Sequence, residues 1–138
     1  MTVQSREILG LDVGLKRTGV ARASSVAQIA EPLMTVATSE VIKTIKKYAA
    51  EHPLEAVVVG LPRNLSGEDT AQTQWVRAWA NEAKGALGVT LYWQDEALTT
   101  IKAADLKAKP KAADLDAISA AAILQDFLDS PQTERVVC

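Results

Sequence analysis

The stretch Ile8–Ala21, ILGLDVGLKRTGVA, joins an apolar run that ends in an aspartate to a short turn that carries two cations. Residues 6–13 have apolar side chains on both faces, which predicts a strand at the centre of a covered sheet. Residues 18–24 predict a second strand. Because only the turn Gly14–Arg17 separates the two strands, we expect them to be antiparallel.

Beyond this stretch the chain alternates helix and strand signals. The expected elements are a strand at 29–36, a helix that begins at Thr38 or Ser39, a strand at 55–60, a helix at about 68–86, a strand at 89–95, a helical segment at 99–108 and a last helix at 113–129. This order predicts an α/β protein with a mixed five-stranded sheet, three antiparallel strands then alternating α/β elements, and helices on both faces. It is the order of the ribonuclease H-like fold. We expect residues 1–138 to form a single domain with a flexible tail at 131–138.

The composition is that of an ordinary globular protein, with 48% hydrophobic and 23% charged residues. The net charge of -2 gives no overall basic signature for nucleic-acid binding, although a group of catalytic acids would mask a basic rim. Cys138 is the single cysteine, which excludes an internal disulfide framework. No signal-peptide pattern or apolar run of about 20 residues is present, so we expect a cytoplasmic protein that does not enter a membrane.

Asp12 is the first residue that points to chemistry. Strand alternation places Ile8, Gly10 and Asp12 on one face, and we expect Gly10 to leave open space beside the carboxylate. The alternative is that Asp12 only caps the following turn, as aspartate often does.

Two further sites supply carboxylates. Asp95 and Glu96 lie at the end of the strand at 89–95, where the alternative is an ordinary loop start. Asp116 lies in the first turn of the last helix, on an apolar stripe that predicts an inward-facing side chain. Asp114, in the same turn, is assigned to capping.

Acids that converge on one spot repel one another unless a cation lies between them. Carboxylates with water are ligands suited to Mg²⁺ or Mn²⁺. A pair of such ions about 4 Å apart can activate a water and stabilise the leaving oxygen during phosphodiester cleavage. The sequence leaves open whether one or two ions bind, and whether Asp95 or Glu96 is the ligand.

Four blocks, LGLDVGLKRTGVA, VVVGLPRNLSGEDT, DEALTT and DAISAAAILQDFLD, resemble the YqgF (RuvX) family in order and spacing, from about Ile8 to Asp129. These are ribonuclease H-like Holliday junction resolvases, also described as nucleases that mature the 5′ end of pre-16S rRNA. The resemblance implies a cytoplasmic, metal-dependent endonuclease. It assigns the catalytic and metal-binding acids as Asp12, Asp95, Glu96 and Asp116, with Mg²⁺ or Mn²⁺ as the cofactor.

Basic and polar residues near the expected site are candidates for nucleic-acid contact, although any one lysine in a charged run is often simply solvated. The chain departs from the family pattern at Ala97, where an arginine suited to phosphate contact is common. The residues expected to bind nucleic acid are Lys16, Arg17, Arg63, Asn64, Lys109 and Lys111.

Two other readings stay open. The departure at Ala97 is compatible with a nucleic-acid-binding module whose ribonuclease H-like site is weak or inactive. An Asp-x-Gly strand and turn also occur in the actin-like ATPases, but this chain is too short for their two-lobed cleft. Structured RNA such as pre-16S rRNA and branched DNA are both compatible substrates. The sequence leaves the oligomeric state open, with a homodimer as one option.

Overall fold

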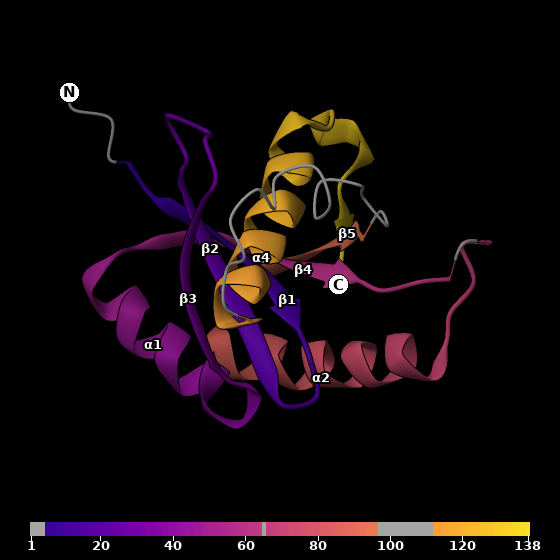
Figure 1. Cartoon of the computed structure of the whole chain (residues 1–138). Helices are drawn as coiled ribbons and strands as arrows, with labels where there is room; N and C mark the ends of the chain where they lie inside the picture. Colours follow the sequence, from indigo (N-terminus) through magenta and orange to yellow (C-terminus); the bar gives the residue numbers. More distant parts are fainter. Residues whose placement is uncertain (1–4, 65, 97–111) are drawn as a thin grey trace.

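The computed structural model describes residues 5–64, 66–96 and 112–138, with side chains from residue 115 onward in the last helix (Figure 1). The secondary-structure elements, in chain order, are β1 (Glu7–Val13), β2 (Arg17–Ser24), β3 (Glu31–Ala37), η1 (Thr38–Glu40), α1 (Val41–Glu51), β4 (Leu54–Leu61), α2 (Ala71–Leu87), β5 (Thr90–Asp95), α4 (Ala112–Asp129), η2 (Gln132–Glu134) and β6 (Val136–Val137). The expected helical segment at 99–108 lies outside the described residues.

One mixed sheet has the strand order β3-β2-β1-β4-β5-β6. β1 pairs antiparallel with β2, and β2 with β3, whereas β1, β4 and β5 run parallel. This arrangement confirms the predicted α/β fold with three antiparallel strands followed by alternating elements.

The sheet has six strands rather than the predicted five. The extra strand, β6, lies within the segment expected to be a tail, and it pairs antiparallel with Tyr92 and Trp93 of β5. The Cys138 N–H also donates to the Leu91 carbonyl at 2.9 Å. Two valines are too short a run to indicate a strand by alternation, so only the neighbouring edge of β5 reveals this pairing.

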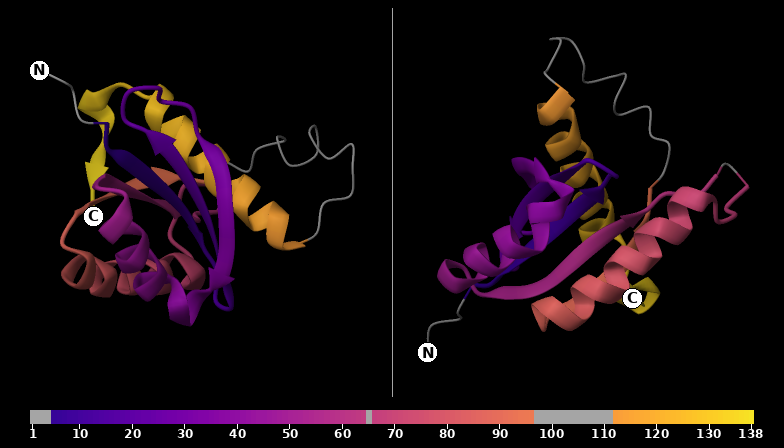
Figure 2. Two further views of the ribbon diagram at one scale, coloured as in Figure 1. Left: turned by 90° about the vertical axis from the view of Figure 1, so that its left-hand side faces the viewer. Right: turned by 90° about the horizontal axis from the view of Figure 1, so that it is seen from below.

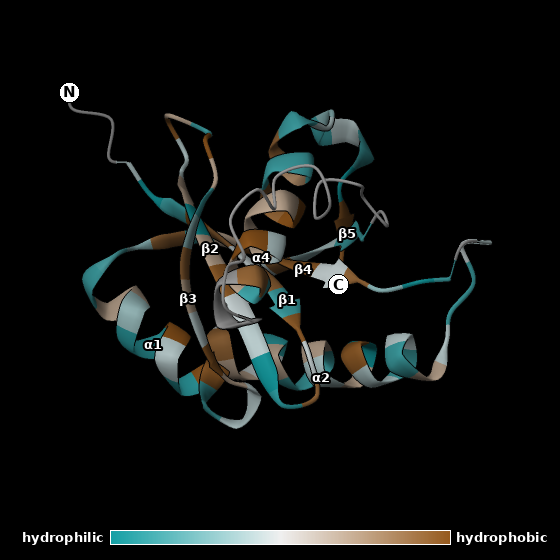
Figure 3. Ribbon diagram, in the orientation of Figure 1, coloured by the Kyte–Doolittle hydropathy of each residue, from teal (hydrophilic) through white to brown (hydrophobic). Residues whose placement is uncertain are grey.

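Helices cover both faces of the sheet, as predicted. Figure 2 shows α1 and α2 on one side of the sheet and α4 on the other. Figure 3 shows hydrophobic and hydrophilic residues alternating along α1 and α2, as expected for helices with one buried side. No helix in the described ranges is long and apolar enough to cross a bilayer.

β1 divides the hydrophobic core into two parts. Leu9, Leu11 and Val13 belong to the cluster beneath α1 and α2, whereas Ile8 belongs to the cluster beneath α4. The alternation predicted for β1 is therefore confirmed, and Asp12 lies on the α4 face of the sheet.

Candidate active site

Asp12 lies near the carboxyl end of β1 with a glycine on each neighbouring strand. It pairs directly with Gly19 of β2. On the other side of β1, Leu11 pairs with Val59 of β4. The next residue of each strand continues this register, so Asp12 lies beside Gly60. The sheet surface around the Asp12 carboxylate is therefore free of neighbouring β-carbons.

The space beside Gly10, which we expected to be open, is filled by α4. A β-carbon on Gly10 would lie 2.6 Å from the Leu124 β-carbon. This expectation was wrong because a strand pattern shows which face a glycine occupies but not how closely a helix approaches that face. Glycine here serves close helix–sheet packing.

Gly19 brings Asp116 onto the sheet. A β-carbon on Gly19 would lie 1.9 Å from the Asp116 carbonyl oxygen. Because Gly19 is the direct partner of Asp12, the backbone of Asp116 lies over the strand adjacent to Asp12. Its side chain is 25% exposed, whereas the helical stripe predicted an inward-facing side chain.

Gly60 likewise lets Glu96 approach the sheet closely, here through side-chain atoms. A β-carbon on Gly60 would lie 3.1 Å from the Glu96 γ-carbon and 3.2 Å from its Oε1. The Glu96 N–H donates to the Leu61 carbonyl at 3.1 Å, which ties the end of β5 to β4. The Glu96 carboxylate therefore lies on the α4 face, on the opposite side of Asp12 from Asp116.

Asp95 lies on the other face of the sheet, although it is the neighbour of Glu96 in the chain. It shares a strand face with Trp93, which packs into the core beneath α2 and lies under the Arg77 guanidinium. Its carboxylate is 3.4 Å from Arg63 Nε, and its side chain is 66% exposed. The structure thus separates the two acids that the sequence left as alternatives.

The chemistry of the carboxylate donors around Asp12 suits a hard divalent cation. Within the described residues, no three His, Cys, Asp or Glu side chains are close enough together to hold an ion as they stand. Asp12 of β1, Glu96 directly after β5 and Asp116 of α4 nevertheless share one sheet face, because Gly19 and Gly60 let Asp116 and Glu96 approach the sheet closely. Carboxylate oxygens are the ligands that Mg²⁺ and Mn²⁺ prefer.

The turn between β1 and β2 carries the predicted cations Lys16 and Arg17. Lys16 is exposed, and Arg17 Nε donates to Asp116 Oδ2 at 2.9 Å. The buried Thr38 holds this turn, because its hydroxyl donates to the Gly14 carbonyl at 2.6 Å and its N–H donates to the Lys16 carbonyl at 2.9 Å. The sequence indicated Thr38 only as a helix cap, so its contact with the turn was missed.

The loop after β4 holds Arg63 and Asn64 in internal contacts. Arg63 lies between Asp69 and Asp95, at 3.7 and 3.4 Å. The Asn64 side-chain oxygen accepts from the backbone N–H groups of Ser66 and Glu68. Both residues therefore shape the loop. Lys109, Lys111 and Ala97 lie outside the described residues.

Arg77 of α2 is a cation near this loop that sequence reasoning missed. Its guanidinium donates to both carboxylate oxygens of Asp69, at 2.7 and 3.3 Å. This hydrogen bonding lowers the pKa of Asp69 and raises the pKa of Arg77. The spacing of Asp69 and Arg77 on the chain does not reveal the pair, because Asp69 precedes the helix in irregular backbone.

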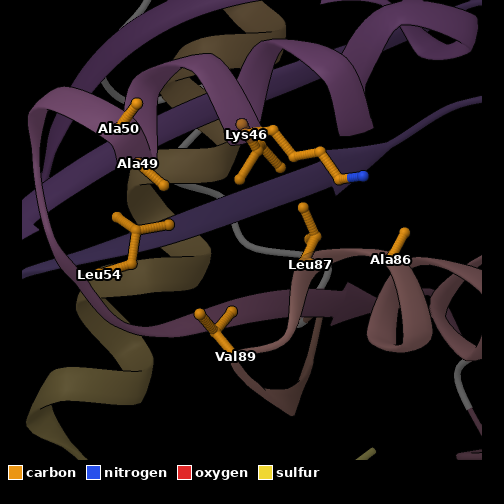
Figure 4. Close-up of a pocket in the computed structure, with 8 residues that line it drawn as sticks. Lys46, Ala49, Ala50, Leu54, Ala86, Leu87 and Val89 are labelled. Carbon is orange, nitrogen blue, oxygen red and sulfur yellow. The ribbon is translucent and has the colours of Figure 1, made fainter.

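A groove of about 290 Å³ lies between α1 and the end of α2 (Figure 4). Leu54, at the start of β4, forms part of its wall. The groove is therefore at the opposite end of the parallel strands from Gly60 and does not belong to the candidate site. Its lining residues are Ile45, Lys46, Ala49, Ala50, Leu54, Ala86, Leu87 and Val89.

Two solved structures of RuvC from Thermus thermophilus share this fold, which agrees with a ribonuclease H-like architecture. Their TM-scores are 0.60 and 0.59, their identities are 16% and 14%, and each alignment covers 96% of this chain and 99% of the other. The second of these structures is a complex with a Holliday junction substrate. At such identities the likeness concerns the fold alone.

Sequence comparison gives the family. The RuvX family model, described as Holliday junction resolvase, matches residues 6–130. A protein named "Putative pre-16S rRNA nuclease" from Roseiflexus sp. (strain RS-1) is 34% identical, over 94% of this chain and 99% of the relative. A protein of the same name from Moorella thermoacetica is 34% identical, over 88% and 94%. These matches confirm the resemblance and support an assignment as a nuclease, a hydrolase. The chain therefore belongs to the RuvX family.

Proposed function

We propose that this protein is a metal-dependent endonuclease that hydrolyses phosphodiester bonds in structured nucleic acid, with 5′-end maturation of pre-16S rRNA as its main reaction. The observation that carries the proposal is the placement of Asp12, Glu96 and Asp116 on one sheet face, beside Gly19 and Gly60. The names of the relatives favour pre-16S rRNA over a Holliday junction as the substrate. The cytoplasm is the expected compartment for this reaction.

Asp12 is the central ligand of the metal in this proposal, because it is anchored on a strand that is buried on both faces. Glu96 and Asp116 approach from either side, over Gly60 and Gly19. Bound Mg²⁺ or Mn²⁺ would supply an activated water and stabilise the leaving oxygen. Asp95 faces Arg63 instead, so we assign it to holding the loop after β4 rather than to the metal.

The cations of the β1–β2 turn are proposed to bind the phosphate backbone beside the acids. Lys16 is exposed, and the hydrogen bonds of Thr38 fix the turn that carries it. A cation carried on a fixed backbone turn next to a carboxylate site would help to place the scissile phosphate. Lys109 and Lys111 remain predicted contacts from the sequence.

The proposal is tested by cleavage of a pre-16S rRNA fragment that retains its 5′ leader, with a four-way DNA junction as the second substrate. Wild-type protein is expected to cut the RNA at a defined site in Mg²⁺ or Mn²⁺ and to be inactive in chelator. Asp12→Asn should abolish cutting, whereas the matched variant Asp95→Asn should retain it. Preferential cutting of the DNA junction would reassign the substrate.

The alternative of a nucleic-acid-binding module with an inactive site is favoured by Ala97, which replaces the arginine common in the family. Tight binding of the RNA fragment with no cleavage in either metal would support this alternative and contradict the nuclease. Adding an arginine back, as Ala97→Arg, tests whether that position alone limits cleavage.

A further inference from the structure

Arg17 and Asp116 form an ion pair within the proposed metal site. Arg17 Nε donates to Asp116 Oδ2 at 2.9 Å, across 99 residues of sequence. The Arg17 side chain is 55% exposed and that of Asp116 is 25% exposed. The guanidinium therefore approaches from the solvent side and covers an oxygen that the proposed function assigns to the metal.

The backbone beneath Arg17 is fixed, so only its side chain is free to rearrange. The Gly14 N–H donates to the Arg17 carbonyl at 2.9 Å and closes the turn. Thr38 hydrogen-bonds to the carbonyls of Gly14 and Lys16, and its hydroxyl also lies 2.9 Å from that of Thr18. The pair consequently joins a rigid turn to a helix that lies directly on β2.

A guanidinium and a divalent cation cannot use the same carboxylate oxygen without strong repulsion. A unit charge and a double charge a few ångströms apart repel each other strongly where water is partly excluded. The ion pair of an exposed arginine is in turn weak enough to exchange. The guanidinium can therefore leave Asp116, and the nearest strong anion available to it would be a phosphate of the substrate.

We propose that Arg17 is a positioning residue that holds the Asp116 carboxylate while no metal is bound and moves to a substrate phosphate when the metal binds. This inference rests on the proposed function, because it needs a metal at Asp12 and Asp116. Metal and nucleic acid then strengthen each other's binding. Each of them breaks the Arg17–Asp116 ion pair, and this ion pair keeps Asp116 from the metal and Arg17 from the phosphate. By linkage, the two effects on affinity must be equal.

The first test is a calorimetric titration of Mn²⁺ into the free protein, without nucleic acid. Arg17→Ala and the longer neutral variant Arg17→Gln should bind Mn²⁺ about tenfold more tightly than wild type, because a repelling charge is lost. Lys43→Ala, which removes an exposed cation from α1 on the opposite side of the sheet, should stay close to wild type. Asp12→Asn should bind weakly. Thermal unfolding of each variant verifies that it is folded, and the glutamine variant carries the test if the alanine variant is not.

The second test measures affinity for a short pre-16S rRNA fragment with and without Ca²⁺, a cation that takes oxygen ligands. Wild type should bind the RNA several-fold more tightly when Ca²⁺ is present, and Arg17→Gln should lose most of this gain. Comparison at equal ionic strength removes the contribution of general screening.

The outcomes separate this inference from the proposed function. If Arg17→Ala and Arg17→Gln bind Mn²⁺ no more tightly than wild type while Asp12→Asn loses binding, the metal site stands and the role of Arg17 is refuted. If neither wild type nor the Arg17 variants bind Mn²⁺, both proposals fail. Binding that appears only in the Arg17 variants supports both.

Discussion

The Asp116 carbonyl oxygen lies 1.9 Å from the point that a β-carbon on Gly19 would occupy. Gly19 is in turn the strand partner of Asp12. Because Gly19 has no side chain, α4 can approach β2 closely at the position next to Asp12, the proposed central metal ligand. The requirement for glycine at this position comes from packing, since no left-handed backbone is involved.

We therefore expect Gly19→Ala to destabilise the protein by about 3 kcal/mol or more, at the upper end of the usual cost of overpacking. The clash is with backbone, so α4 must shift as a unit. Urea unfolding measures the change. Gly85→Ala is the matched control, because nothing lies within 4 Å of its β-carbon position in α2. There the same substitution should be neutral or stabilise by up to about 1 kcal/mol. Equal stability of the two variants would contradict the close approach of α4.

Gly60→Ala should behave differently from Gly19→Ala. Its β-carbon would meet the Ile123 δ-carbon at 2.6 Å and the Glu96 γ-carbon at 3.1 Å. Both neighbours are side-chain atoms that can rotate away, so the free energy of unfolding should fall by only about 1 kcal/mol. Cleavage should fall by about tenfold or more, because a small misplacement of a reacting group is costly. Unfolding and RNA cleavage measured on the same preparation test this; unchanged cleavage would argue against a role for the close approach of Glu96 to Gly60.

Glu96 and Asp95 should have unequal effects on cleavage. Glu96→Gln is expected to lower the cleavage rate by at least about 10- to 100-fold, the range found even for residues that only support a metal ligand. Asp95→Asn should change the rate by less than about threefold, because it loses only an exposed ion pair with Arg63. Single-turnover cleavage in Mn²⁺ gives both rates. The reverse order of effects would show that Asp95 is the ligand.

Glu7, at the opposite end of β1, should make stability depend on pH. Burial raises the pKa of Glu7, but hydrogen bonds from Arg22 and Tyr48 and the charge of Arg22 outweigh burial and lower it overall. The same contact and burial raise the pKa of Tyr48 to about 12. Since the folded state holds the Glu7 carboxylate ionised, its stabilisation is fully present above the unfolded pKa of about 4.3 and is lost as pH falls through the folded value.

Glu7→Gln should accordingly cost about 1.5–3 kcal/mol at pH 7, the range for hydrogen bonds to charged groups. The difference in melting temperature between wild type and Glu7→Gln should shrink as pH falls from 7 toward 3. Glu55→Gln, an exposed change at the start of β4, is the control. A difference that stays constant over this range would show that Glu7 contributes by packing rather than by charge.

The sequence allowed the sheet to be predicted because its signals are local. The apolar side chains of β1 alternate between two cores, and the order of strands and helices leaves few topologies. Strand and helix periodicity likewise predicted the face of β1 that carries Asp12 and the inward stripe of the last helix that carries Asp116, but not that the two residues lie on one side of the sheet.

What the sequence did not reveal depends on contacts between distant segments. Alternation sends Asp95 and Glu96 to opposite faces, but the position of β5 beside β4 decides which of them lies on the α4 face. Arg17 and Asp116 are 99 residues apart in the chain, and nothing in the sequence around either residue predicts that they form an ion pair. β6 is too short to show a period of its own. These features require the assembled sheet.

The placement of α4 also affects when the proposed activity can arise during synthesis. Asp12 leaves the ribosome early, whereas Asp116 lies on the last long helix, which packs mainly on β2, β1 and β3. Domains usually fold as units, and contacts of high sequence separation form slowly. In a nascent chain Asp116 therefore cannot join Asp12 until the C-terminal helix has been made and has docked. A nuclease assembled in this way would be unable to cut RNA while it is still being translated.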